Sequence, residues 1–307
     1  MALDYDLAVV GAGCAGLAAG VYGGRAGMRV VIFDKGKAGG QLLITPHIEN
    51  YIGFKTVGGP DLAQLMLEHA QEYSEVREFE PVESVAVVGD HVVVKSAGGE
   101  VTAAALLITT GAEHKHLGVP GEDRLAGKGV SYCATCDGFF FKGRRVVTVG
   151  GGSTAAIDAL YLKGIGVDVS IVHRRGALRA ESALREDIAR QGIPVLYDTV
   201  IEEILGDRKV DRVRVRRVDT GALSELPVDG VFVAVGQRPN NELVDQLGLD
   251  KTPDGLVRVD SAYRTSSPRV FAAGDLIGGV RQAITAAAAG TVASLNVLPL
   301  VGKQYPW

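Results

Sequence analysis

The chain has 307 residues, enough for two domains of ordinary size, each with its own hydrophobic core. Hydrophobic residues make up 47% and charged residues 22% of the sequence, a composition typical of soluble globular proteins that excludes extensive disorder. A net charge of -4 gives no general attraction for nucleic acid or an anionic membrane surface, so we expect neither as a partner.

Glycine and cysteine counts narrow the class further. Glycine occurs 41 times, which indicates tight turns and close backbone approach to ligands. Three cysteines are too few for a disulfide framework, so we expect a cytoplasmic protein, with Cys14 a small buried side chain. No basic leader precedes the first apolar run, and glycines and arginines interrupt the apolar stretches. We therefore expect no signal peptide and no transmembrane helix.

Residues 5–34 predict a strand, a glycine-rich turn, a helix and a second strand. Gly11, Gly13 and Gly16 lie in the turn, and Asp34 closes the second strand. In this context the pattern is a dinucleotide fingerprint, because the glycines allow close approach of a pyrophosphate and the helix N-terminus supplies N–H donors. The acidic residue suits a ribose 2′-OH, so this copy is predicted to bind an unphosphorylated adenosine. A glycine-rich packing turn is the alternative.

Residues 91–111 predict two alternating strands around Gly98 and Gly99, with a buried strand that leads into Thr110 and Gly111. Segment 112–131 is rich in glycine and is predicted to be a connector.

Cys133 and Cys136 lie three positions apart in the motif CATC. At this spacing the thiols share one face of a helical turn and can form and break a disulfide, while free N–H groups at such a turn stabilise a thiolate. Asp137 is a candidate proton carrier for that exchange. The three phenylalanines at 139–141 are expected to pack the following strand.

Two alternatives remain for this cysteine pair. His114 and His116 precede it, so a zinc site with two histidines is one, although the order does not match known zinc motifs. A pair of unremarkable buried thiols is the other, but that leaves the nucleotide sites with nothing to reduce. We therefore expect redox chemistry here and no metal.

A second fingerprint copy spans residues 144–175, with Gly150, Gly152 and Ala155 at its key positions. The slot that Asp34 fills in the first copy is occupied, at the same offset from the first glycine, by a basic cluster. This cluster comprises His173, Arg174, Arg175 and Arg179. Arginines suit a ribose 2′-phosphate, so this copy is predicted to bind NADPH; solvation of a strand end is the alternative role.

Residues 181–191 predict a helix, and residues 268–290 predict a short strand followed by a small-residue helix. The fold class is therefore α/β, with two Rossmann-like, three-layer ββα dinucleotide-binding domains. The second domain, residues 117–241, is expected to be inserted into a discontinuous first domain of residues 1–116 and 242–307. Two dinucleotide sites in one chain indicate electron transfer from a nicotinamide to a flavin.

Over nearly its whole length the sequence resembles the low-molecular-weight thioredoxin reductases of bacteria and archaea. The motifs that carry the resemblance occur in the order GAGCAG, GGQL, EN, CATCDG, GGGSTA, HRRxxxR, AVGQRPN and GDxxxxxRQAITA. CATC stands just before the second fingerprint, whereas lipoamide-type relatives carry their cysteines in the flavin domain.

The resemblance implies FAD in the first domain and NADPH in the second. The residues that it assigns to FAD are Gly11, Gly13, Gly16, Asp34, Gly40, Gln41, Asn50, Thr110, Gly111, Gly274, Asp275, Arg281, Gln282 and Ala283. Those that it assigns to NADPH are Gly152, Ser153, Thr154, His173, Arg174, Arg175 and Arg179, with Gly236 as a further cofactor-binding position. Ser153 departs from the acidic or amide residue usual in the family, but its hydroxyl can still cap a helix.

The resemblance also implies the reaction. Hydride passes from NADPH to FAD and then to the Cys133–Cys136 disulfide, and the dithiol reduces thioredoxin or a thioredoxin-like protein. Cys136 is the implied flavin-proximal thiol, Cys133 the thiol that attacks the partner and Asp137 the acid-base residue. The family consists of homodimers whose nicotinamide domain swings, and the crossings at 112–118 and 236–242 suit hinges.

Several alternatives remain open. The same scaffold can use ferredoxin or a deazaflavin as electron donor, which the arginine cluster argues against. It can also serve a peroxiredoxin, but the extra N-terminal redox domain of that group is absent from this sequence. A non-catalytic nucleotide-binding or zinc-binding module is the alternative from a different class.

Overall fold

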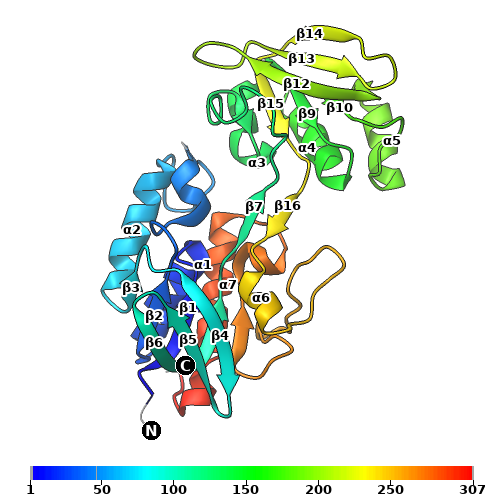
Figure 1. Cartoon of the computed structure of the whole chain (residues 1–307). Coiled ribbons are helices and arrows are strands. Elements are labelled where there is room, and N and C mark those ends of the chain that lie inside the picture. The colour runs from blue at the N-terminus through cyan, green and yellow to red at the C-terminus, as the bar shows by residue number, and fades with distance from the viewer. Residues whose placement is uncertain (1–2, 46, 306–307) are drawn as a thin grey trace. The chain divides into compact units, whose positions relative to one another are not determined.

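The computed structural model describes residues 3–45 and 47–305, and the chain divides into two compact units. Unit 1 comprises Met1–Glu113 and Arg238–Trp307, and unit 2 comprises His114–Gln237. Unit 1 is therefore built from both ends of the chain, and unit 2 is inserted between them (Figure 1). The predicted α/β architecture, with one domain inserted into another, is confirmed.

A mostly parallel sheet forms the centre of unit 1. Its strands are β1 (Tyr5–Val10), β2 (Val30–Phe33), β3 (Glu75–Arg77), β4 (Val82–Val88), β5 (His91–Ser96), β6 (Gly99–Ile108) and β17 (Val270–Ala272). The spatial order is β3-β2-β1-β6-β5-β4, and β17 also pairs with β6. The β4–β5 and β5–β6 pairings are antiparallel, and the other pairings are parallel.

The two faces of this sheet are covered by different layers. Its helices are α1 (Cys14–Arg25), α2 (Gly59–Gln71), α6 (Glu242–Gln246) and α7 (Ala283–Leu295). Because successive strand residues point to opposite faces, Leu7 and Val9 pack toward α1 and α7, whereas Ala8 and Val10 pack toward the β4–β5 hairpin and α6 (Figure 1). Burial of both faces explains the nearly continuous apolar run of β1.

Unit 2 repeats this three-layer plan. Its parallel sheet has the order β11-β10-β9-β15-β8, and an antiparallel sheet has the order β12-β13-β14. The strands are β8 (Val130–Ser131), β9 (Arg145–Val149), β10 (Asp168–Val172), β11 (Val195–Leu196), β12 (Thr199–Leu205), β13 (Arg212–Arg217), β14 (Leu223–Pro227) and β15 (Gly230–Val233). The antiparallel sheet covers one face of the parallel sheet, and α4 (Ser153–Gly164) and α5 (Ser182–Arg190) cover the other (Figure 1).

Short elements complete the chain. The strands β7 (Ala112–His114) and β16 (Gln237–Pro239) pair with each other where the chain passes between the units. A one-turn helix, α3 (Ala134–Asp137), follows β8, and the 3₁₀ turns are η1 (Gly40–Ile44), η2 (Gly138–Phe141), η3 (Gly274–Ile277) and η4 (Leu298–Val301).

Near the C-terminus, Lys303 Nζ binds Asp6 Oδ2 at 2.9 Å and the carbonyl oxygen of Gly27.

One segment is long and apolar enough to cross a membrane. It spans Ala283–Val301 and has a mean hydropathy of 1.7. Core helices of soluble proteins meet the same criterion, and here Ala289, Ala293 and Val297 are buried in the core that this segment shares with α1.

Candidate redox and dinucleotide sites

Cys133 and Cys136 are joined by a disulfide, with their Cα atoms 5.3 Å apart, as the spacing in the CATC motif predicts. Cys133 is the N-cap of α3, and the backbone N–H of Cys136 donates a hydrogen bond to Cys133 Sγ at 3.2 Å. Both residues are only partly buried, so the bridge is open to exchange. When the bridge is reduced, this N–H can donate to the thiolate of Cys133, and a hydrogen bond to the charged form stabilises it.

Asp137 is held by a serine that the sequence interpretation did not select. The hydroxyl of Ser131 lies 2.6 Å from Asp137 Oδ2 and accepts a hydrogen bond from the backbone N–H of Cys133 at 3.1 Å. Ser131 ends β8 and is buried, so the sheet itself fixes its position. The only signal in the sequence is a hydroxyl residue two positions before Cys133.

The three phenylalanines after the motif do not pack as a group, which corrects the sequence-based expectation. Phe141 packs edge-to-face on Phe232, with the ring centroids 5.3 Å apart. Phe139 and Phe140 are 62% and 43% exposed. They lie in the 3₁₀ turn η2, whose three residues per turn send consecutive side chains in three directions, so only one of them reaches the core.

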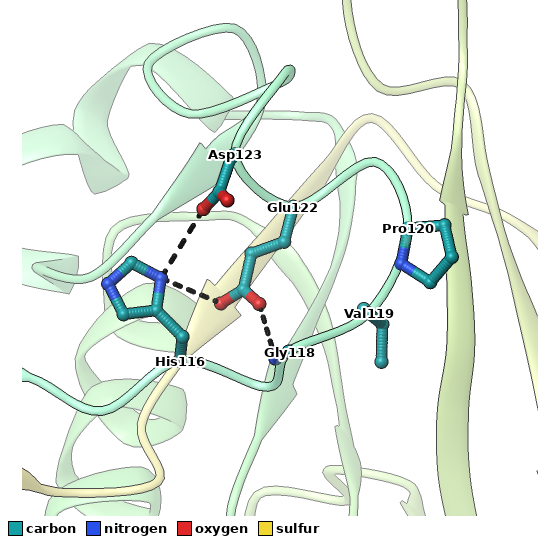
Figure 2. A pocket seen from close by; sticks show the side chains of 6 residues that line it. All are labelled: His116, Gly118, Val119, Pro120, Glu122 and Asp123. Atoms are coloured by element: carbon teal, nitrogen blue, oxygen red, sulfur yellow. Dashed lines mark hydrogen bonds and ion pairs between the residues drawn. The ribbon is translucent and has the colours of Figure 1, made fainter.

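His114 and His116, the histidines of the zinc alternative, have other partners. The ring of His114 stacks on Tyr132, and His116 Nδ1 lies 3.6 Å from a carboxylate oxygen of both Glu122 and Asp123 (Figure 2). The cysteine sulfurs are bonded to each other. Within residues 3–45 and 47–305, no group of three or more His, Cys, Asp or Glu side chains is arranged to hold a metal ion.

Glu122 is a buried carboxylate that sequence inspection missed. It is 2% exposed and accepts hydrogen bonds from the backbone N–H groups of Leu117 and Gly118, at 2.9 and 2.8 Å, and from the hydroxyl of Tyr132 at 2.9 Å. Burial, together with this bond, raises the pKa of Tyr132, so the phenol remains a donor. Glu122 lines a cavity of about 480 Å³ at the start of unit 2 (Figure 2). Residues 114–131 of the predicted connector therefore belong to unit 2.

In the first glycine turn, close backbone contacts leave no room for a side chain at two of the glycines, whereas the third faces open space. A Cβ on Gly11, whose φ is +109°, would lie 2.4 Å from the carbonyl oxygen of Thr109, and one on Gly16 would lie 1.9 Å from that of Gly11. Gly13, the N-cap of α1, has open space where its Cβ would be. Backbone N–H groups beside this space fit a pyrophosphate.

Burial raises the pKa of Cys14 to about 12, so this thiol stays protonated.

Asp34 holds the same turn together. Its Oδ2 accepts a hydrogen bond from the backbone N–H of Ala12 at 2.7 Å, and its Oδ1 accepts one from Gly36 at 2.9 Å. Gly40 faces the open side of the turn, since a Cβ on it would lie 3.2 Å from the Cα of Gly13. Asp34 and Gly40 thus meet at the turn, as a dinucleotide site requires.

Three of the other residues assigned to FAD form hydrogen bonds to distant parts of unit 1. Gln41 Nε2 donates to the carbonyl oxygen of Ala112 at 3.1 Å, and Asn50 Nδ2 donates to Gln282 Oε1 at 3.0 Å. Thr110 and Asn240 exchange two hydrogen bonds of 2.8 Å. Gly111 follows with a φ of +67°, and Ala283 begins α7.

A cavity of about 200 Å³ in unit 1 is lined by residues that include Gly274, Asp275 and Arg281. Burial raises the pKa of Asp275, an effect that the Arg281 guanidinium opposes. Arg281 has a φ of +55°, and its Nε is buried without a hydrogen-bond partner among the described residues. A strained residue with an unpaired buried donor is costly unless a ligand accepts its hydrogen, so these residues fit a polar cofactor.

The second glycine turn has the same design. A Cβ on Gly150 would lie 2.4 Å from the carbonyl oxygen of Ala234, whereas Gly152, the N-cap of α4, faces open space. Ser153 and Thr154 begin α4 and are partly buried and exposed, respectively. This turn can therefore also take a phosphate.

His173 lies directly beneath this turn. A Cβ on Gly151 would lie 2.1 Å from the imidazole ring, which is 4% exposed and bonded through Nε2 to the carbonyl oxygen of Ala177. Burial, with smaller effects from the nearby arginines, lowers the pKa of His173, so the ring is neutral at physiological pH. His173 therefore packs against the second glycine turn.

The three arginines of the cluster are exposed. Arg174 and Arg175 follow His173 at the end of β10, and the backbone N–H of Arg179 donates to the carbonyl oxygen of Gly151 at 2.6 Å. Guanidinium groups beside a phosphate turn suit a second phosphate. Gly236 lies apart from the cluster in sequence, where its carbonyl oxygen accepts from the backbone N–H of Lys115.

Comparison with known proteins agrees with this combination of sites. The model of the family described as pyridine nucleotide-disulphide oxidoreductase matches residues 5–290. A thioredoxin reductase of Streptomyces coelicolor is 40% identical over 96% of this chain and 94% of the relative, and one of Bacillus subtilis is 38% identical over 95% and 93%. The crystal structure of thioredoxin reductase from Streptococcus pyogenes is 36% identical, covers 97% of this chain and 98% of its own, and has a TM-score of 0.91.

Proposed function

Because the chain belongs to the pyridine nucleotide-disulphide oxidoreductase family, we infer that it is an NADPH-dependent thioredoxin-disulfide reductase and a flavoprotein. When bound, NADPH supplies a hydride and FAD passes the two electrons on to the protein disulfide. The observation that carries this function is the partly exposed Cys133–Cys136 disulfide, placed in the same unit as the arginine-flanked phosphate turn. Alternatives with another electron donor or a peroxiredoxin partner are not favoured, because the relatives matched over almost their whole length are thioredoxin reductases.

We propose that unit 1 holds FAD. Its pyrophosphate would lie at the N-terminus of α1, beside Gly13 and Gly40, where a side chain is absent on both sides. Asp34 would keep one carboxylate oxygen on the turn and offer its remaining lone pairs to the ribose. The unpaired Nε of Arg281 would donate to the polar chain of the cofactor.

Unit 2 would hold NADPH at its own glycine turn. Gly152 leaves room for the pyrophosphate, and the backbone N–H groups at the start of α4 would bind it. Arg174 and Arg175 would bind the 2′-phosphate, with Arg179 beside them. His173 would support the turn from below.

Cys133 is proposed as the thiol that attacks the disulfide of thioredoxin, and Cys136 as the thiol that resolves the mixed disulfide. The hydrogen bond from Cys136 N–H stabilises the Cys133 thiolate before the attack. Asp137 would take the proton from a thiol of the reduced pair and return it to a departing thioredoxin sulfur.

The enzyme is proposed to act as a cytoplasmic homodimer, a location that its low number of cysteines supports. Apolar side chains on three helices of unit 1 support a second copy as partner: Tyr22, Leu65 and Val292 are 40%, 49% and 42% exposed. Light scattering of the purified protein should give twice the mass of one chain, and a monomer at working concentration would contradict the dimer.

Replacement of Cys136 by Ser tests the function. We expect NADPH still to bleach the flavin, because both cofactor sites are intact, whereas thioredoxin reduction is lost. Stopped-flow absorbance and a coupled thioredoxin assay measure the two steps separately. A variant that turns over thioredoxin at the wild-type rate would remove the assigned role from this disulfide, and a preparation that binds no flavin would remove the proposed function.

A further inference from the structure

We propose that Ser131 is a positioning residue for the thiol–disulfide exchange, in which its hydroxyl fixes the carboxylate of Asp137 relative to the backbone of Cys133. This inference rests on the proposed function, in which Asp137 moves the proton of the exchange. Ser131 occupies the end of β8, the edge strand of the parallel sheet of unit 2, and is 5% exposed. A rigid element therefore carries the hydroxyl to the redox turn.

One hydroxyl group connects both ends of the CATC turn. It accepts the backbone N–H of Cys133 at 3.1 Å and lies 2.6 Å from Asp137 Oδ2. It also lies 3.3 Å from the carbonyl oxygen of Cys133. A hydroxyl has a single hydrogen, and the contact with the carboxylate is much the shorter, so the hydrogen belongs to the bond with Asp137.

This bond affects the charge of Asp137 as well as its position. A hydroxyl that donates to a carboxylate stabilises the ionised form, and charge-assisted bonds of this kind are stronger than neutral ones. Ser131 thus keeps Asp137 ready to accept a proton. The variant Ser131→Ala would leave the turn closed by the disulfide but would remove this hydroxyl donor.

The exchange balances with Asp137 as a proton carrier. A thiol of the reduced pair gives its proton to Asp137, and the resulting thiolate attacks one sulfur of the thioredoxin disulfide, whose other sulfur leaves and takes up the proton. The second cysteine then attacks the mixed disulfide, and the remaining thiol hydrogen finishes on the second thioredoxin sulfur. The cysteine pair is oxidised by two electrons, thioredoxin is reduced by two, and Asp137 ends unchanged.

Other titratable groups lie on the elements packed against α3. Helix α4 carries Asp158, Tyr161 and Lys163, and Tyr161 lies close to Gly138 at the end of the motif. The 3₁₀ turn η2 carries none. Burial raises the pKa of Asp158 to about 6, so any titration near this pH must be assigned with an Asp158 variant.

The experiment compares Ser131→Ala with Ser131→Thr, which retains the hydroxyl. Thr148→Val is the matched control, because Thr148 has a buried hydroxyl in the same sheet that has no hydrogen-bond partner among the described residues. Infrared difference spectra of the oxidised enzyme follow the protonated carboxyl band against pH, with Asp137→Asn and Asp158→Asn to assign it. This measurement needs neither NADPH nor thioredoxin.

We expect the titration midpoint of Asp137 to rise by about one pH unit in Ser131→Ala, the loss expected for one charge-assisted hydrogen bond. Ser131→Thr should restore it, and Thr148→Val should leave it unchanged. At neutral pH, thioredoxin turnover in Ser131→Ala should fall by roughly tenfold while NADPH still bleaches the flavin at the wild-type rate.

A wild-type midpoint for Asp137 in Ser131→Ala would overturn the role of Ser131. A shifted midpoint together with a wild-type enzyme that does not reduce thioredoxin would support the bond and remove the proposed function instead. The two failures are therefore separable.

Discussion

Two exposed arginines are expected to determine the choice between NADPH and NADH. Arg174 and Arg175 follow His173, which occupies after β10 the position that Asp34 has after β2, and no carboxylate is paired with either arginine among the described residues. In the double variant Arg174→Ala/Arg175→Ala, kcat/KM for NADPH should fall by roughly 100-fold, while that for NADH is nearly unchanged, because only NADPH carries the 2′-phosphate.

Arg208→Ala is the control for this pair, because Arg208 is an exposed arginine in another loop of unit 2. Stopped-flow flavin reduction with each nucleotide measures the preference. An equal loss of kcat/KM with NADPH and NADH would show that the arginines do not recognise the 2′-phosphate.

Asp158 makes the stability of the enzyme depend on pH. Burial raises its pKa from 3.8 to about 6 in the folded state. The native state therefore binds more protons than the unfolded state between these values, so stability falls as pH rises from about 4 to 6 and the loss persists above pH 6. Asp158→Asn should remove this loss, with no gain below pH 4 and a gain of up to about 3 kcal/mol above pH 6. Denaturant unfolding at pH 4 and pH 7 measures it, and an equal effect at both pH values would contradict the assignment.

Local spacing allowed the redox residues to be predicted, and non-local contacts explain what was missed. Cys133 and Cys136 bond because three positions on one turn bring them together, whatever the rest of the fold does. Ser131 acquires its role from the end of a strand, and Glu122 from a tyrosine ten residues further along the chain. The sequence alone does not show that Ser131 bonds to Asp137 or Tyr132 to Glu122, because both contacts depend on how the chain folds around the end of β8.

At the scale of elements, the first glycine turn depends on the close packing of helices α1 and α7. Helices α1 and α7 approach so closely that a Cβ on Gly290 would lie 1.9 Å from the carbonyl oxygen of Ala15. Ala15 lies in the first turn of α1, directly beside the open space at Gly13. The C-terminal segment thus supports from behind the turn where the pyrophosphate of FAD is proposed to bind.

Gly290→Ala should therefore destabilise unit 1 by about 1 to 3 kcal/mol or more and reduce its flavin content, because the added methyl group meets backbone that cannot move aside. Gly164→Ala is the matched control: this glycine also lies in a helix, but its Cβ would meet nothing within 4 Å. It should be neutral or stabilising by up to about 1 kcal/mol. Thermal unfolding and the ratio of flavin to protein absorbance test both variants, and equal effects would contradict the packing argument.

The glycine turns and the strands around them could be predicted because the pattern of apolar run, glycines and helix is contiguous in the sequence. The layer opposite the helices was harder to predict. In the β4–β5 hairpin and the β12–β14 sheet, buried and exposed residues are mixed along each strand. The sequence pattern therefore does not indicate which face of a parallel sheet each of them covers.

For the whole molecule, the doubled fingerprint predicted two α/β units, and the chain passes between them through the paired strands β7 and β16. Because these strands lie side by side, the ends of unit 1 at Glu113 and Arg238 can be joined by a short glycine linker with unit 2 left out. We expect this shortened chain to fold and bind FAD but not to be reduced by NADPH. Flavin absorbance and stopped-flow mixing are the measurements, and a colourless product would place part of the flavin site in unit 2.

Completion of unit 1 waits for the segment that follows unit 2 in the chain. Strand β17, helix α7 and the contact of Lys303 with Asp6 all come from the last segment of the chain, so a nascent polypeptide that has left the ribosome as far as residue 237 can complete unit 2 but not unit 1. Until then β6 lacks its neighbour β17, and the apolar face that α7 will cover stays open. We therefore expect the coenzyme to bind only after this segment has been synthesised, so that the thiol-bearing unit of the protein matures before the unit that is to supply its electrons.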